Sequence, residues 1–406
     1  MESNTNPTVF NNVGFLQNRY VSNYQKLRKM TFNGELELES LYKEGLKNLE
    51  AREFEAALEK FETLVERVPQ HPDFLACKAI VLGHLKRYEE CLNYFDRAIE
   101  FRPDDERMWL NRGIALGEWE MHEKAIASFK KVLEINPNSY EAWGSRGSSL
   151  VALGKNKEAI GCYDKAVEIN PNYYKAWGNR GMALANLGRV KAALSSYDKA
   201  LEIKQDDPEV WFNKGCVFLA TEKYDKAKEM FEKALEIQPT HLGGLSNRGI
   251  VISKQGDNEG ALACYEEVIE LYPTDTHAWN NRGLVLRRLG RIEEAIASYD
   301  KSIECDPTNF EAWDNRGYAF TKIGKLKEAM ASVEKSLEVK PNHVNGIYNK
   351  GYCYALMGRE KLAIEFIAKA IKLNPKKYLP AAKTDPDLAK LRKNSKFRSL
   401  LLRGRL

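Results

Sequence analysis

The 406-residue sequence lacks the features that mark secreted or membrane-spanning proteins. Its seven cysteines are scattered, odd in number and without a CxxC pair, so we expect reduced thiols and no disulfide framework. No run of 18 or more apolar residues occurs, which excludes a membrane-spanning helix. The stretch from Met1 to Tyr20 is polar and lacks the apolar block of a signal peptide. Together these absences predict a cytoplasmic location.

Motifs for catalysis and for cofactor binding are also missing. The six histidines form neither an HExxH motif nor another metal-ligand spacing, and no phosphate-binding GxxxxGK loop, GxGxxG turn or GxSxG elbow occurs. The repeats described below leave too little of the chain for a separate catalytic domain. We therefore expect no enzyme activity, no cofactor and no metal site.

Positive charge is concentrated near the C-terminus. The net charge is +5, but residues 376–406 carry +8 and residues 1–375 carry −3. A nucleic-acid-binding repeat protein more often carries its excess charge along the body, so nucleic acid is disfavoured as the partner. The basic tail still leaves contact with an acidic partner, with RNA or with a membrane surface open.

Several residue types recur with a constant period of 34, which is the strongest signal in the sequence. The prolines are Pro69, Pro103, Pro137, Pro171, Pro239, Pro273, Pro307, Pro341 and Pro375. Six tryptophans keep the same period: Trp109, Trp143, Trp177, Trp211, Trp279 and Trp313. Glycines and alanines recur in phase with both. Residues 38–377 therefore form ten contiguous units without insertion or deletion.

Each unit predicts two helices. Bulky or small residues at positions 4, 8 and 11 have the spacing of one helical face, and positions 20, 24 and 27 form a second face. Glycines such as Gly154, Gly188, Gly290 and Gly324 suit the left-handed residue after the first helix, and proline at position 32 ends the second. Such a pair cannot bury its apolar face alone, so stacking of pairs must supply the core.

This pattern resembles the tetratricopeptide repeat over about five-sixths of the chain. The runs NRG at positions 6–8 and YDKA at positions 24–27 are similar to those of bacterial arrays. The resemblance implies an all-α, right-handed α-α superhelical solenoid that binds a partner in its concave groove. The basic and asparagine set with which some relatives hold a C-terminal carboxylate is not matched in any three successive repeats.

Two flanking segments complete the predicted organisation. Residues 1–37 form an N-terminal extension in which residues 1–14 are expected to be disordered. Apolar residues at helical spacing predict a capping helix over residues 15–31, with a basic amphipathic membrane anchor as the alternative. Residues 378–406 are expected to form a capping helix and a basic tail.

The groove implied by the resemblance lies on the face of each first helix opposite the core. Asparagine recurs there at position 6, where it either bonds to the backbone of an extended peptide or bridges adjacent helices, and both roles remain open. Apolar residues in repeats 4–6 and basic residues in repeats 7–9 predict a partner peptide or helix with an acidic part. The candidate groove residues are Asn179, Asn213, Asn247, Asn281, Asn315, Asn349, Met182, Phe212, Lys254, Arg287, Arg288 and Lys322.

A second basic row occupies position 7, on the core side of the first helix. Opposite charges stand sixteen positions apart, between position 25 of one repeat and position 7 of the next, at eight of nine junctions. We therefore interpret this row as ion pairs between repeats and not as a phosphate-binding stripe. The exception is Lys130 with Arg146.

The leading hypothesis is a non-catalytic scaffold or adaptor that binds another protein. Two alternatives remain: a nucleic-acid-binding helical repeat protein and a regulatory subunit that controls an enzyme. A peripheral membrane contact is compatible with each of them.

Overall fold

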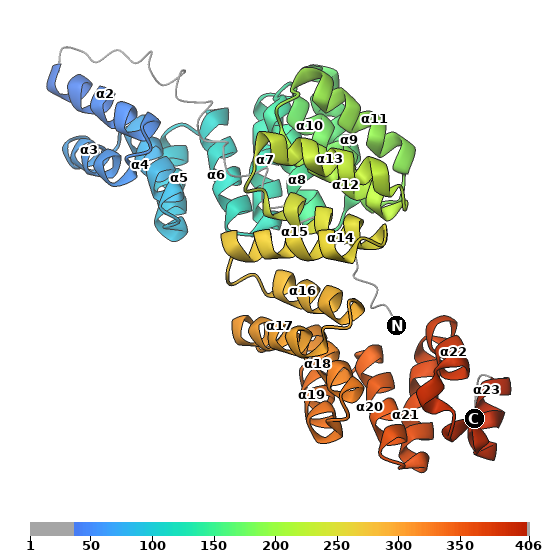
Figure 1. Ribbon diagram of the computed structural model, residues 1–406. Helices are drawn as coiled ribbons and strands as arrows, with labels where there is room; N and C mark the ends of the chain where they lie inside the picture. The colour runs from blue at the N-terminus through green and yellow to red at the C-terminus, as the bar shows by residue number, and fades with distance from the viewer. Residues whose placement is uncertain (1–35, 404–406) are drawn as a thin grey trace. The chain divides into compact units, whose positions relative to one another are not determined.

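The computed structural model describes residues 36–403, which contain 22 α-helices, two short 3-10 helices and no strand (Figure 1). The all-α class and the solenoid of helix pairs are therefore confirmed. The chain divides into two compact units between residues 217 and 218, inside helix α12. We call their described parts the N-terminal unit, residues 36–217, and the C-terminal unit, residues 218–403. The predicted helix over residues 15–31 lies outside the described residues.

The N-terminal unit holds five helix pairs and the start of a sixth. Its helices are α2 (Leu36–Glu50), α3 (Phe54–Arg67), α4 (Pro72–His84), α5 (Tyr88–Phe101), α6 (Glu106–Glu118), α7 (His122–Ile135), α8 (Tyr140–Ala152), α9 (Asn156–Ile169), α10 (Tyr174–Asn186) and α11 (Val190–Ile203). Helix α12 (Pro208–Ala220) begins in this unit. The predicted alternation of first and second helices is confirmed.

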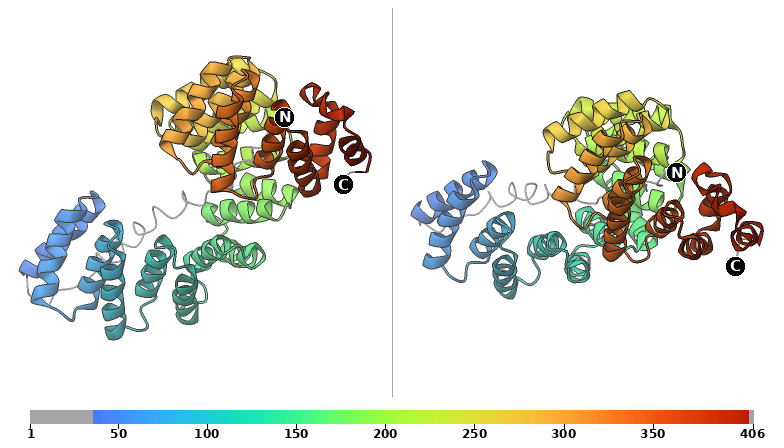
Figure 2. Two further views of the ribbon diagram at one scale, coloured as in Figure 1. Left: turned by 90° about the horizontal axis from the view of Figure 1, so that it is seen from below. Right: turned by 60° about the horizontal axis from the view of Figure 1, so that its bottom comes forward.

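The C-terminal unit continues the same alternation and ends in a different arrangement. Its helices are α13 (Tyr224–Ile237), α14 (Leu242–Lys254), α15 (Asn258–Leu271), α16 (Thr276–Arg288), α17 (Ile292–Cys305), α18 (Phe310–Lys322), α19 (Leu326–Val339), α20 (Val344–Leu356) and α21 (Glu360–Leu373). After the last pair come α22 (Pro375–Thr384), η2 (Pro386–Leu388), η3 (Leu391–Lys393) and α23 (Ser395–Arg403). Both views in Figure 2 show this last part beside α20 and α21.

A left-handed residue separates the two helices of every repeat. The predicted glycines at this position have positive φ, for example 72° at Gly154 and 80° at Gly290. Four repeats carry another residue there with φ between 57° and 61°, namely Arg52, Lys86, Glu120 and Glu222. The turn geometry is thus kept even where the sequence lacks the favourable residue.

Close contact between the two helices of a repeat depends on glycine at position 8. In repeat 4, a Cβ at Gly147 would lie 2.7 Å from Cε1 of Tyr163, whose ring is 0% exposed. The same contact joins Gly113 to Phe129 and Gly283 to Tyr299. The absence of a side chain at position 8 therefore makes room for the ring at position 24.

The recurring tryptophans join each first helix to the turn before it. In all six, the indole Nε1 donates a hydrogen bond to a backbone carbonyl six residues earlier, at 2.8–3.0 Å. The acceptor is the proline at position 32 of the preceding repeat or, for Trp211, Gln205. The recurring tryptophans and the recurring prolines are thus joined by the same hydrogen bond.

The predicted ion pairs between repeats are confirmed at seven of the eight junctions, with N–O distances of 2.6–3.1 Å. The pairs are Lys78–Glu62, Arg112–Asp96, Arg180–Asp164, Lys214–Asp198, Arg282–Glu266, Arg316–Asp300 and Lys350–Glu334. The prediction is wrong for Arg248, which pairs with Glu267 in its own repeat. Position 26 is lysine in the other repeats from 3 to 9, and only repeat 7 offers a carboxylate there.

Position 23 shows a second set of contacts to the same basic side chains. Four arginines donate to a serine at this position at 2.7–2.9 Å, as Arg112 does to Ser128. Where position 7 is lysine, position 23 is large, and Lys78 lies 4.5 Å from the ring centre of Tyr94. In repeat 1 the charges are reversed, and Glu44 pairs with Lys60 at 3.1 Å. The side chains at position 7 therefore join helices to one another in the described repeats.

Gly147→Ala should lower the free energy of unfolding by about 1–3 kcal/mol, because the buried ring of Tyr163 cannot move away from the added methyl group. Gly161→Ala is the matched control, since Gly161 lies in helix α9 of the same repeat and a Cβ there would meet no atom within 4 Å. The control should instead stabilise the protein by up to about 1 kcal/mol. Urea denaturation followed by circular dichroism checks both, and equal effects would contradict the packing argument.

Candidate functional site

The first helices of successive repeats in the C-terminal unit contact one another, α16 with α18 and α18 with α20. Their positions 5, 9, 12 and 13 form the surface that we call the A face. Its half-buried or exposed members are Arg287, Arg288, Tyr318 and Lys322, and its buried members, 1–3% exposed, are Asn280, Asp314, Tyr348 and Tyr352. They lie on three helices that the repeat packing holds side by side. The A face is thus presented by rigid elements.

The predicted groove residues fall into both units. Asn179 and Met182 lie on α10, and Phe212 and Asn213 on α12, in the N-terminal unit. The remaining ones lie in the C-terminal unit on four first helices: Asn247 and Lys254 on α14, Asn281, Arg287 and Arg288 on α16, Asn315 and Lys322 on α18, and Asn349 on α20. The predicted apolar and basic parts therefore belong to different units.

Three of the asparagines at position 6 connect neighbouring first helices. The Nδ2 of Asn179, 2% exposed, donates to Ser148 Oγ at 3.3 Å. Asn315 donates to Asn280 Oδ1, and Asn349 to Asp314 Oδ1, both at 2.9 Å. Of the two roles left open by the sequence, these contacts show the bridging one.

Two predicted cations meet on the A face through an aromatic ring that the prediction did not include. The guanidinium carbon of Arg287 lies 4.9 Å from the ring centre of Tyr318, and Lys322 Nζ lies 5.0 Å from the same ring. Lys322 Nζ is also 5.4 Å from the ring centre of Tyr352, and the two tyrosine rings are 5.9 Å apart. Cations and tyrosines therefore alternate from α16 to α20.

One of these cations already holds a carboxylate of the same chain. Lys322 Nζ lies 3.0 Å from Asp387 Oδ2, and the Tyr352 hydroxyl donates to the same oxygen. The Tyr352 hydrogen bond, with help from Lys322, lowers the pKa of Asp387. Next to it, Leu388 is 0% exposed, so the turn η2 is anchored beside α20.

Sequence reasoning missed Tyr318, Tyr352 and Asp387. Tyrosine at position 9 occurs in repeats 9 and 10 but not in the preceding repeats, and this change was the signal that could have identified the first two. Contact with Asp387 depends on how the segment after the repeats folds back, which the repeat period does not encode.

Arg287 resembles Lys322 but has no such acid. Its guanidinium is half-buried, and no carboxylate within residues 36–403 lies at ion-pair distance. Its neighbour Arg288 reaches the preceding first helix, where Nη1 donates to Ser253 Oγ at 2.5 Å. Lys254, at the end of α14, is exposed.

The A face also contains a buried acid. Asp314 is 3% exposed, and burial raises its pKa from 3.8 to about 7, although the Asn349 hydrogen bond opposes this shift. Burial also lowers the pKa of Lys377 on α22, whose Nζ donates to Asn345 Oδ1 at 2.9 Å. The buried part of the A face thus includes one carboxyl group whose pKa burial raises to about 7.

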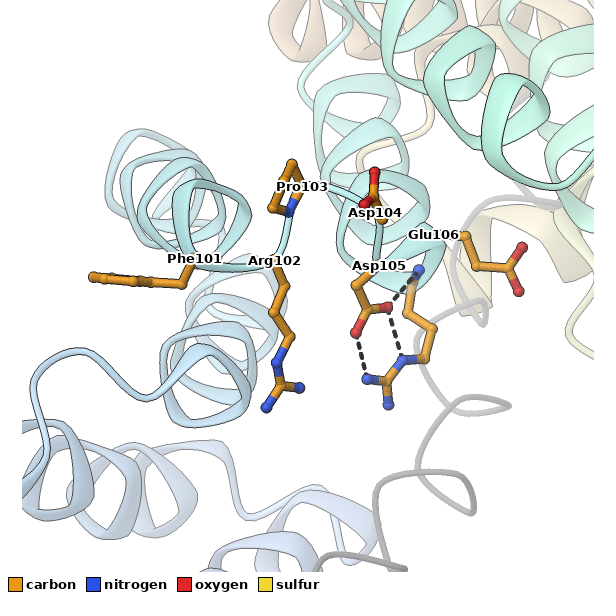
Figure 3. Close-up of a pocket in the computed structure, with 7 residues that line it drawn as sticks. Phe101, Arg102, Pro103, Asp104, Asp105 and Glu106 are labelled. Carbon is orange, nitrogen blue, oxygen red and sulfur yellow. Dashed lines mark hydrogen bonds and ion pairs between the residues drawn. The ribbon is translucent and has the colours of Figure 1, made fainter.

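A separate cavity of about 580 Å³ lies in the N-terminal unit at the turn from α5 to α6 (Figure 3). Asp105 caps α6 by accepting from the backbone nitrogen of Arg107, and its carboxylate accepts from the Arg107 side chain at 2.9 Å. Arg102 pairs with the buried Asp73 at 2.6 Å. These four side chains form ion pairs with one another, whereas Asp104 and Glu106, which also line the cavity, form none with residues 36–403.

Metal binding and membrane crossing have no support in the described part of the chain. No group of three or more histidine, cysteine or acidic side chains in residues 36–403 is arranged to hold a metal ion. None of the helices there combines the length and apolar character needed to span a bilayer.

These features define a helical-repeat interaction protein, and comparison with known proteins agrees. Tetratricopeptide repeat models match residues 42–106, 145–208 and 247–310, residues 107–139 and 208–241, residues 298–331, and residues 344–377. The chain belongs to the tetratricopeptide repeat family. The comparison with curated proteins gave no match.

Solved structures show likeness of fold. A tetratricopeptide repeat protein from Parabacteroides merdae is 20% identical with a TM-score of 0.51, over 63% of this chain and 99% of that chain. A chain of the Cut9–Hcn1 hetero-tetramer of the APC/C is 15% identical with a TM-score of 0.51, over 95% of this chain and 81% of that chain. YrrB, described as having an unusual peptide-binding site, is 28% identical with a TM-score of 0.38, over 46% of this chain and 97% of that chain.

Asp314→Asn should remove a loss of stability that the wild type suffers as pH rises. The folded-state pKa, about 7, lies above the unfolded value of 3.8, so the native state holds the proton more tightly and stability falls between these pH values. From pH 5 to pH 8 the variant should gain about 2–3 kcal/mol over the wild type, since each pH unit between the two pKa values is worth about 1.4 kcal/mol. Urea denaturation across this range checks it, with Asp104→Asn, at an exposed site, as the control. A constant difference would contradict the burial of an ionisable carboxyl.

Proposed function

We propose that this protein is a non-catalytic scaffold or adaptor whose A face binds an acidic segment of a partner protein. The family assignment supports protein binding in general, and the cation–tyrosine row supports the acidic character of the ligand. The proposal includes a cytoplasmic location, in keeping with seven cysteines that are all free.

The observation that carries the proposal is the binding of Asp387 by Lys322 and Tyr352. One repeat earlier, Arg287 and Tyr318 form a similar pair of a cation and a tyrosine. Since the first pair holds a carboxylate with an ion pair and a hydroxyl donor, we infer that the second takes a carboxylate from outside the chain. A charge-assisted hydrogen bond to a half-buried arginine is stronger than one between neutral groups.

The predicted groove residues of the N-terminal unit are less suited to contact a partner. Met182 is 5% exposed and Asn179 is 2% exposed, so they offer little surface to a ligand. Phe212 is half-buried and remains the better candidate for an apolar contact there. We therefore centre the proposal on Arg287, Arg288 and Lys322.

The two alternatives differ from this proposal in what the A face must recognise. Nucleic acid is disfavoured because residues 1–375 carry a net charge of −3, so the repeats lack the excess of positive charge that a polyanion would follow. A regulatory subunit would use the same acidic contact, and only the identity of the bound protein separates it from a scaffold.

Arg287→Glu/Arg288→Glu should abolish capture of the acidic partner, because reversed charge replaces a charge-assisted contact with repulsion. Proteins retained by the wild type but not by this variant are candidate partners. Acidic peptides from them should bind the variant at least about tenfold more weakly, since hydrogen bonds to charged groups contribute about 1.5–3 kcal/mol. Fluorescence anisotropy measures the affinity.

The matched control is Lys325→Glu/Lys327→Glu, which makes the same charge change at exposed positions beside and within α19. It should retain partner binding. If the double charge reversal alters the circular dichroism spectrum, the single variant Arg287→Gln replaces it in the binding experiment. Equal capture by the wild type and both Arg287 variants would contradict the proposal.

Asp387→Asn should strengthen binding of the same acidic peptides several-fold. The substitution keeps the size of the side chain but removes the charge that neutralises Lys322, so Lys322 becomes available to the partner. The pair is partly exposed, so stability should change by no more than about 1 kcal/mol. Anisotropy and urea denaturation check the two effects. Weaker peptide binding with unchanged stability would show that Asp387 does not compete for this site.

A further inference from the structure

The segment after the last helix pair, residues 375–402, presents an unusual density of cations. Six exposed basic residues lie on α22, η3, α23 and the turns between them: Lys376, Lys383, Lys390, Lys393, Lys396 and Arg398. None of the six forms an ion pair with a carboxylate in residues 36–403. We call this set the cap cations.

Some lysines of the repeats are neutralised locally. On five second helices, lysine at position 26 pairs with glutamate three residues later at 2.5–2.8 Å, as in Lys131–Glu134 and Lys335–Glu338. The segment contains two acids, and both are engaged. Asp385 accepts from the backbone nitrogen of Asp387, and Asp387 pairs with Lys322. Neither Asp385 nor Asp387 forms an ion pair with a cap cation.

Helix geometry groups several of these cations. Lys376 and Lys383 are seven residues apart on α22 and so share its exposed face, opposite the buried Tyr378 and Ala382. Lys390 and Lys393 are three residues apart at a 3-10 turn, where that spacing places side chains on one side. The positive charge therefore forms local clusters that are not spread evenly around the segment.

One apolar side chain stands beside the charge. Leu402 is 85% exposed, although its neighbours Leu400 and Leu401 are buried with Phe397 in the core. On α23 it follows the exposed Arg398 by four residues, so the two side chains are adjacent on the helix surface. An exposed leucine next to cations suits the boundary between lipid headgroups and acyl chains.

We propose that the C-terminal segment is a docking surface for an anionic lipid bilayer. The cap cations would meet the headgroup charge, and Leu402 would enter the interface. This contact uses none of the A-face residues of the proposed partner site, so it stands or fails independently of that proposal.

Nucleic acid fits the same charge less well. Binding of single strands without sequence preference relies on exposed aromatic rings on which bases stack. The aromatic rings of the segment, Tyr378 and Phe397, are 3% and 0% exposed. The residues before position 376 carry a net charge of −3, so the array adds no basic track along which a long polyanion could continue. Binding to a bilayer requires positive charge only at the end of the array.

The test is sedimentation of the full chain with phosphatidylcholine vesicles, with and without phosphatidylserine. Binding is expected only with phosphatidylserine and should weaken with added salt. Lys390→Glu/Lys393→Glu/Lys396→Glu should reduce partition at least about 100-fold, since each basic residue near an anionic surface is worth about fivefold. Leu402→Ser should reduce partition into vesicles several-fold. Any effect of this substitution on retention by nucleic acid should be smaller by that factor.

The matched control is Lys157→Glu/Lys191→Glu/Lys327→Glu, which makes the same change in net charge at exposed lysines at position 18 of three repeats. It should bind vesicles within about threefold of the wild type, because the proposed contact uses only the cap cations and Leu402. Equal loss in both triple variants would show a general charge effect and overturn the proposal. Retention by duplex or single-stranded nucleic acid without vesicle binding would also overturn it. Far-ultraviolet circular dichroism confirms that each variant is folded.

Discussion

The contact between a small residue on each first helix and a buried residue on the second helix is the interaction on which the rest of the structure depends. The small residue is glycine in nine of the ten repeats and Ala79 in repeat 2. Because Gly147 has no side chain, the ring of Tyr163 can lie against its backbone, and the pair closes. A closed pair still exposes an apolar side, which only the next pair covers. The tryptophan bonds and the ion pairs at position 7 then determine how successive pairs align.

The same packing determines what the first helices offer to a ligand. Positions 7 and 8 face the second helix, and positions 5, 9, 12 and 13 are left on the other side. In the C-terminal unit these positions bring Arg287, Tyr318, Lys322 and Tyr352 into one row. The basic residues at position 7 carry as much charge, yet they pair with acids of the neighbouring repeat. Location within the repeat, and not charge alone, separates structural cations from candidate binding cations.

Most of the fold could be predicted because its signals are local and repeated. Helix pairs, turns, and seven of eight junction ion pairs follow from residue types at fixed positions in the repeating unit. The failure at Arg248 has a local cause as well, since Glu267 supplies a nearer carboxylate than Glu232. The candidate site was predicted in part. Arg287 and Lys322 were identified from their charge and position, whereas Tyr318 and Tyr352 were not among the predicted residues, although Met182 at the same position of repeat 5 was.

The sequence by itself determined the family, the repeat boundaries and the separation of charge between the array and the residues after it. Periodicity suffices for these because each repeat places the same residue in the same environment. Only the tertiary structure decided that Asp387 binds Lys322 and Tyr352, that three of the position-6 asparagines bridge helices, and that Asp314 is buried. Each depends on contact between segments 31–65 residues apart, or on the solvent that neighbouring helices exclude. Neither these contacts nor the exclusion of solvent can be read from the spacing of residues along the chain.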